Sequence, residues 1–283
     1  MNSAMNSALH YEAEAFDTSR PQLMGRHAAG ESFLRGYSRH AAVDKLLCYT
    51  RTRKDFEDFE RRVAALGGRS RPCQWIAHGD LTGLGRAGCL FHPAPSLADL
   101  AWQRRFSSPG AYSLCGVTHT IASQNIMDAI GTMMVAPLQS WDAVICTSRA
   151  AKATIEHVHG RWSDYLAERT GGKGISPIQL PIIPLGVECD EFASSTNSQN
   201  DRAALRKRHG IGEDDVAVLF MGRLSYHAKA HPLPLYFGLE EAAQRTGKRI
   251  HIIQAGWFAN ESIEKSFVGT MRSCSSSTRL APS

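Results

Sequence analysis

The chain has 283 residues, and its 32 Lys and Arg against 27 Asp and Glu give a formal net charge of +5. With 43% hydrophobic and 21% charged residues, the composition excludes a disordered or fibrous protein, and the length suggests roughly one or two domains. No dense Lys/Arg run indicates nucleic-acid binding, and no apolar run approaches the roughly 20 residues of a membrane span. The seven cysteines are dispersed without a Cys-x-x-Cys, which indicates reduced thiols in a cytoplasmic protein.

Short apolar, β-branched runs alternate with helical patterns along the chain. Strands are expected at Leu9–Phe16, Lys45–Tyr49, Gln74–His78, Gly88–His92, Tyr112–Thr118, Ala143–Thr147, Ile178–Pro184, Val216–Met221 and Arg249–Ala255. Apolar positions three and four apart predict helices at Asp55–Leu66, Leu97–Phe106, Arg149–Arg169 and Leu235–Thr246. The alternation predicts an α/β protein with a mainly parallel sheet.

A small, polar segment, ASSTNSQND at Ala193–Asp201, predicts a linker and a domain boundary near residue 200. A charged helix is expected after it, at Arg202–His209. The end of the chain, Thr270–Ser283, has no periodicity and is expected to be irregular. Only two clear strands follow Asp201, so the second domain is expected to be truncated, with an unpaired strand edge.

Two glycine patterns could approach a nucleotide. Gly83, Gly85 and Gly88 form a Gly-x-Gly-x-x-Gly, the pattern of dinucleotide-binding folds, but prolines follow within seven residues. We therefore expect a loop there, and a nicotinamide oxidoreductase has little support. Gly25 and Gly30, in GRHAAGESFLRGY, follow the first expected strand and lead into an amphipathic helix. They could let backbone N–H groups approach an anion or a sugar, or form a plain strand-to-helix turn.

His119 ends an expected strand in GVTHTIAS, and ligands of open α/β sheets gather beyond the carboxyl ends of strands. An imidazole there could donate a hydrogen bond or move a proton, although most single histidines are structural or exposed. His157 and His159 lie two apart on an expected helix, so they do not share a face. We expect them to be surface residues and not a metal site.

Cationic residues cluster after the strand in VAVLFMGRLSYHAK. Gly222 ends the strand, Arg223 follows it, and Lys229 precedes a helix that Pro232 and Pro234 can open. An arginine can bind two phosphate oxygens at once, and a lysine adds a mobile charge, so with a helix N-terminus the group could bind a diphosphate. The alternative is two solvated cations on a loop.

Four segments together resemble the family 4-type (group 1) retaining glycosyltransferases of GT-B architecture. They are GRHAAGES, THTIAS, DAVICTSRAAK followed by IPLGVECDEF, and MGRLSYHAK, and the likeness extends to about Val268. The resemblance implies an N-terminal Rossmann-like domain on the acceptor side at 1–200. It also implies an incomplete, donor-binding second Rossmann-like domain at 201–283.

The resemblance also implies a function for the residues that match it. Arg223 and Lys229, with Gly222, would hold the diphosphate of a nucleotide-sugar donor and stabilise the leaving group. His119 would sit near the transferred sugar, and Gly25 and Gly30 would let the backbone approach the donor. No Asp-x-Asp motif occurs, in keeping with transfer that needs no metal ion or other cofactor.

The chain departs from that family in two ways. No two glutamates lie eight apart, where relatives carry a pair that holds the donor, and Leu185 stands where relatives usually have Asn. The alternative is therefore a non-catalytic remnant or binding protein with a GT-B-like domain. The acceptor could be a glycan, a lipid-linked sugar or a small molecule, and a cytoplasmic protein with peripheral contact to the inner face of the membrane fits the mild positive charge.

Overall fold

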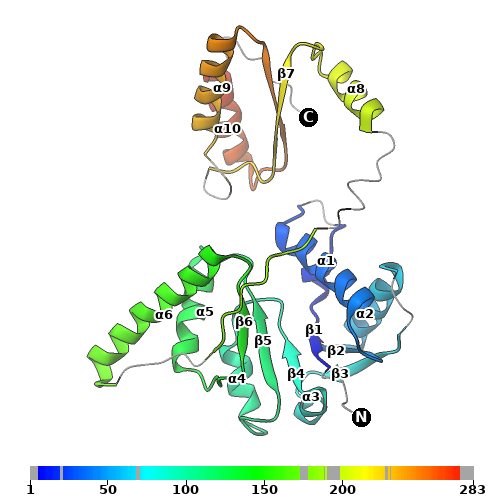
Figure 1. The fold of residues 1–283 in the computed structure, drawn as a ribbon, viewed down its shortest axis with the longest axis vertical. Helices are drawn as coiled ribbons and strands as arrows, with labels where there is room; N and C mark the ends of the chain where they lie inside the picture. Colours follow the sequence, from blue (N-terminus) through cyan, green and yellow to red (C-terminus); the bar gives the residue numbers. More distant parts are fainter. Residues whose placement is uncertain are drawn as a thin grey trace. The chain divides into compact units, whose positions relative to one another are not determined.

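A computed structural model describes residues 6–19, 22–67, 71–172, 178–187, 189, 198–226, 229 and 231–274. Its contacts divide the chain into two compact units, Met1–Glu188 and Cys189–Ser283 (Figure 1). Among the residues described, no helix is both long and apolar enough to cross a membrane.

The first unit is built on a six-stranded, entirely parallel sheet. Its strands are β1 (Ala8–His10), β2 (Leu46–Thr50), β3 (Cys73–Ala77), β4 (Cys89–Phe91), β5 (Ser113–Val117) and β6 (Ala143–Ile145). Their order across the sheet is β3-β2-β1-β4-β5-β6. This confirms the predicted α/β class with a parallel sheet, and the order is that of doubly wound dinucleotide-binding domains.

Helices cover both faces of this sheet (Figure 1). In chain order they are the 3-10 helix η1 (Ala13–Phe16), α1 (Gly25–His40), α2 (Arg53–Ala65), α3 (Leu81–Ala87), α4 (Ala98–Arg104), α5 (Gln124–Thr132), the 3-10 helix η2 (Met133–Val135) and α6 (Arg149–Thr170). Three of the predicted helices correspond to α2, α4 and α6, with ends that differ by at most two residues.

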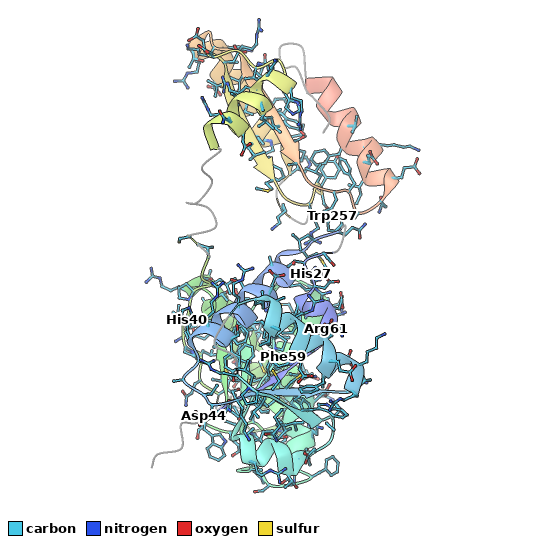
Figure 2. All side chains as sticks on the ribbon, turned by 90° about the vertical axis from the view of Figure 1, so that its right-hand side faces the viewer. His27, His40, Asp44, Phe59, Arg61 and Trp257 are labelled. Atoms are coloured by element: carbon cyan, nitrogen blue, oxygen red, sulfur yellow. The ribbon has the colours of Figure 1, made fainter. Side chains whose placement is uncertain are left out.

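The sheet separates two apolar cores because successive strand residues point to opposite faces. On β2, Leu46 and Cys48 pack with residues of α1 and α2, whereas Leu47 and Tyr49 pack with residues of α3, α4 and α6. Figure 2 shows Phe59 of α2 inside the first of these cores and Arg61 two residues on at the surface. All five residues of β2 are buried, as expected for a strand covered on both sides.

The expected strand at Ile178–Pro184 is not formed. The segment runs parallel to β6, but only isolated bridges form, Ala143 to Gln179 and Cys146 to Ile182. Pro181 and Pro184 lack the N–H groups that a continuous ladder requires, so the pairing is interrupted.

Two expectations near the carboxyl edge of the sheet were also wrong. The strand expected at Leu9–Phe16 ends at His10, and the chain continues into η1, which brings Phe16 against Tyr11 in the core. The glycine-rich segment expected to be a loop is the helix α3. Asp80 caps its N-terminus by accepting a hydrogen bond from the Gly83 N–H (2.8 Å), and Gly88 ends it at φ +82°.

The second unit contains α8 (Ser198–Arg208), β7 (Val216–Met221), α9 (Pro232–Thr246), β8 (Ile250–Ala255) and α10 (Glu261–Cys274). Strands β7 and β8 pair in parallel as a two-stranded sheet. Of the expected linker, Ser198–Asp201 is helical and 193–197 lies outside the described residues. Thr270–Cys274 was expected to be irregular but belongs to α10, and 275–283 lies outside the described residues.

Candidate functional site

The carboxyl ends of β1 and β4 mark the point where the strand order of the first unit reverses. From β1 the chain passes to β2 and β3 on one side, whereas β4, β5 and β6 extend on the other. Open α/β sheets bind ligands at such a reversal point, because the connections leave it in opposite directions. His10 is the last residue of β1, and His92 directly follows β4.

These two histidines bond to each other. Nδ1 of His10 lies 2.9 Å from Nδ1 of His92, and the ring centroids are 4.9 Å apart. Burial, together with the charges of His78 and Arg51, lowers the pKa of His10 to about 4. Burial also lowers the pKa of His92 to about 3, with His10 contributing. Both rings are therefore neutral at pH 7.

Further polar and aromatic side chains surround the pair on the same face of the sheet. Tyr49 of β2 meets the His10 ring edge to face at 5.3 Å and stacks on His78, which follows β3, at 5.5 Å. The Tyr49 hydroxyl accepts hydrogen bonds from the Gln103 side chain (2.9 Å) and from the Gly79 N–H (3.3 Å). These contacts hold Tyr49 and His78 in place beside the pair.

His119 lies at the same edge, after β5, and is partly buried. Burial lowers its pKa, and the positive charge of Arg26 at the start of α1 lowers it further. The preceding Thr118 is fully buried and accepts a hydrogen bond from the Thr147 N–H at 2.9 Å, which ties the ends of β5 and β6 together. The predicted position of His119 beyond a strand end is therefore correct.

The early glycines do not form an open loop. Gly25 is the exposed first residue of α1, and a Cβ there would meet no atom within 4 Å. Gly30 lies in the second turn of the helix and is buried, and a Cβ there would overlap the carbonyl oxygen of Ala15. Gly30 thus permits close packing of α1 on η1, which is a structural reason for glycine at this position.

His159 also differs from its expected surface position. It is buried on α6, where Nε2 contacts the Ile130 carbonyl oxygen at 3.1 Å, and its pKa is lowered by burial. His157 is exposed as expected. Across the described part of the chain, no group of three or more His, Cys, Asp or Glu side chains is arranged to hold a metal ion.

In the second unit, the structure brings Arg223 and Lys229 to the end of β7. Gly222 has φ +147°, and the Lys229 side chain passes 3.5 Å from the position of a Cβ on that glycine. The Arg223 guanidinium lies over the Trp257 ring at 5.8 Å, and Leu224 N–H donates to the Trp257 carbonyl oxygen (3.0 Å). The two cations therefore flank one strand end, as the sequence predicted.

Sequence reasoning missed His10, His92 and Tyr49. The available signal was the recurrence of histidine at strand ends, since His10, His78, His92 and His119 each end or follow a strand of the sheet. Which two of them meet depends on the strand order, and a sequence pattern does not contain that order.

Comparison with known proteins yields one likeness of fold. No family model and no curated protein matches the chain. A solved structure of the Candida albicans trehalose-6-phosphate phosphatase N-terminal domain matches with TM-score 0.55 and 11% identity, covering 98% of this chain and 71% of that one. At this identity the match establishes the fold alone.

The comparison overturns the identification as a glycosyltransferase. The matched structure is described as a domain of a phosphatase, so the predicted family, the predicted sugar transfer and the nucleotide-sugar partner are wrong. The four segments that suggested the family are short. Their order along the chain reflects the alternation of strands and helices, which many unrelated families share.

Proposed function

We propose that the first unit is a Rossmann-like domain that binds a phosphorylated sugar at the reversal point of its sheet, without a metal ion or other cofactor. The His10–His92 pair is the observation that carries this proposal. It places two partly exposed polar rings on either side of the point where ligands of such sheets bind. A purely structural role would more commonly be filled by apolar side chains at these positions.

The surroundings of the pair support a sugar carrying a phosphate. Imidazole and amide groups are suited to sugar hydroxyls, and His10, His92 and Gln103 supply them. Arg51 follows β2 at the same edge, is exposed, and is close enough for its charge to act on His10. Its guanidinium can bind two phosphate oxygens. The matched structure belongs to a protein named for trehalose 6-phosphate, which supports the same ligand class.

The proposal is tested by calorimetric titration of the full chain with trehalose 6-phosphate, glucose 6-phosphate, glucose and inorganic phosphate at pH 7. We expect the sugar phosphates to bind more tightly than either glucose or phosphate alone. Arg51→Ala should weaken their binding roughly tenfold or more, as expected for the loss of a charge-assisted contact. Arg169→Ala, at the exposed far end of α6, should not change it. Equal affinity of Arg51→Ala and wild type would refute the assignment.

A second candidate is hydrolysis of the bound phosphate ester, which the name of the matched structure favours. His119 is the group proposed to contact the sugar or move a proton, because it lies at the same edge and is neutral at pH 7. The same mixtures are assayed for released phosphate. Release that is absent in His119→Asn but retained in His157→Asn would support hydrolysis, whereas binding without release leaves recognition as the function.

For the second unit we propose that Arg223 and Lys229, with Gly222, bind an anionic group at the end of β7. The fixed position of Arg223 over Trp257 and the contact of Lys229 with Gly222 support this. Titration with pyrophosphate tests it. Arg223→Ala and Lys229→Ala should each weaken binding, and Arg245→Ala, a largely exposed cation on α9, serves as control. The domain boundaries 1–200 and 201–283 stay a prediction, whereas the acceptor and donor sides depended on the glycosyltransferase identification that was overturned.

A further inference from the structure

The short contact between His10 and His92 fixes how their protons are arranged. Two nitrogens 2.9 Å apart are at hydrogen-bond distance, so one Nδ1 carries the hydrogen and the other offers its lone pair. A neutral imidazole has one N–H and one lone pair. The ring that donates through Nδ1 therefore has a free lone pair on Nε2, and the ring that accepts has an Nε2–H.

Both Nε2 atoms can reach a ligand. Neither Nε2 atom has a hydrogen-bond partner among the described residues. Neither of them is among the fully buried polar atoms that lack a partner, so solvent reaches both. Nε2 of His10 is 3.9 Å from a carboxylate oxygen of the exposed Glu12, which is beyond hydrogen-bond distance. The pair thus presents one donor and one acceptor.

The groups around the pair keep it neutral. His10 faces Tyr49 of β2, Arg51 after β2, His78 after β3, and Glu12 on its own segment. Arg51 and His78 oppose a positive charge on His10, Glu12 favours one, and His92 faces His10. Burial has the largest effect and also disfavours the charged form of His10. It outweighs the attraction of the largely solvated Glu12 carboxylate. A neutral pair at pH 7 follows.

We propose that the His10–His92 pair determines specificity. It forms hydrogen bonds with hydroxyl groups of the sugar and disfavours the phosphate. A hydroxyl can donate to the free Nε2 lone pair and accept from the Nε2–H, whereas a phosphate dianion offers only acceptors. The phosphate is thereby directed to Arg51, and the sugar is oriented with its hydroxyls on the pair. This inference rests on the proposed function of the same site.

The first test begins with the protein alone. Nitrogen NMR of the histidine rings in the full chain at pH 7 should show His10 and His92 as neutral rings in opposite tautomers, one Nδ1–H and one Nε2–H. Addition of glucose should shift their Nε2 signals, and addition of inorganic phosphate should not. Two identical tautomers, a protonated ring at pH 7, or a response to phosphate alone would overturn the inference.

The second test separates the pair from the rest of the site. His92→Asn keeps a polar atom near the Nδ1 position and removes Nε2, and His157→Asn on α6 is the matched control. Glucose 6-phosphate and its single-deoxy analogues are titrated into each protein. In wild type, one analogue should bind roughly two- to tenfold more weakly than the parent, as for one lost hydrogen bond. In His92→Asn that penalty should disappear, while affinity for inorganic phosphate should be unchanged.

The outcomes distinguish the two proposals. Glucose 6-phosphate could bind while the deoxy analogue still binds more weakly than the parent to His92→Asn. In that case the pair does not bind the sugar hydroxyls, although the proposed function stands. If glucose shifts the Nε2 signals but the phosphate group adds no affinity, the proposed function fails and the role of the pair stands. If neither glucose nor its phosphate affects the pair, both are wrong.

Discussion

Replacing Asp142 by asparagine should destabilise the first unit severely. Asp142 and Arg104 are fully buried, and the guanidinium donates to both carboxylate oxygens at 2.7 Å. The carboxylate also accepts from the Leu114 and Gln139 N–H groups, each at 2.8 Å. Asparagine keeps the shape and removes the charge, so Arg104 remains as an uncompensated buried cation. Breaking such a pair from one side costs roughly 3–5 kcal/mol.

The change can be followed by tryptophan fluorescence during urea and thermal unfolding, because four of the five tryptophans lie in Met1–Glu188. For a unit of this size, the expected loss corresponds to a melting temperature lower by roughly 6–20 °C. Asp128→Asn, at an exposed position on α5, should leave it within a degree or two. Arg104→Met combined with Asp142→Leu should recover much of the loss, because no unpaired charge remains.

If Asp142→Asn lowered the free energy of unfolding by less than about 1 kcal/mol, the range of an exposed pair, the buried ion pair would not have the strength expected here. The same would follow if the double apolar variant were less stable than Asp142→Asn. The pair matters for the site because Arg104 ends α4 next to Gln103, which holds Tyr49. Calorimetry on a destabilised but folded Asp142→Asn sample would show whether sugar-phosphate binding weakens along with stability.

Three further predictions concern stability. The folded-state pKa values of His10 and His92, about 4 and about 3, lie below the unfolded value. The histidines should therefore lower the free energy of unfolding as the pH drops from 7 to 4, by about 3 kcal/mol for His10 alone, and should not lower it above about pH 7. A flat pH–stability profile between pH 7 and 4 would contradict this. Gly30→Ala should cost roughly 1–3 kcal/mol in urea unfolding, because its methyl group meets the Ala15 carbonyl oxygen, and Gly25→Ala should cost little. The buried Tyr112 hydroxyl has no hydrogen-bond partner among the described residues, so Tyr112→Phe should leave the melting temperature unchanged or raised, and a clear drop would reveal a partner.

Much of the fold follows from local pattern. The strands of the first sheet were predicted because apolar β-branched runs of about five residues lie between turn signals, and α2, α4 and α6 because their apolar residues recur on one face. The errors have local causes as well. The prolines of the 178–184 segment interrupt its pairing, and α3 was missed although Asp80 and Gly88 are a regular N-cap and C-cap.

The site was predictable only in part. His119, Arg223 and Lys229 lie at strand ends as their positions in the sequence indicated. The His10–His92 contact joins strands 82 residues apart in the chain, and it exists because β1 and β4 are neighbours in the sheet. That adjacency is set by the packing of helices on both faces, which a single strand pattern does not encode.

We propose that a phosphorylated sugar binds at the reversal point between β1 and β4. Backbone NMR of the full chain during titration with glucose 6-phosphate tests it most directly, because each amide reports on its own surroundings. We expect the largest shifts at residues 9–12, 49–52 and 91–94, which surround the His10–His92 pair. Shifts confined to the amino ends of the strands, or to the second unit, would contradict it.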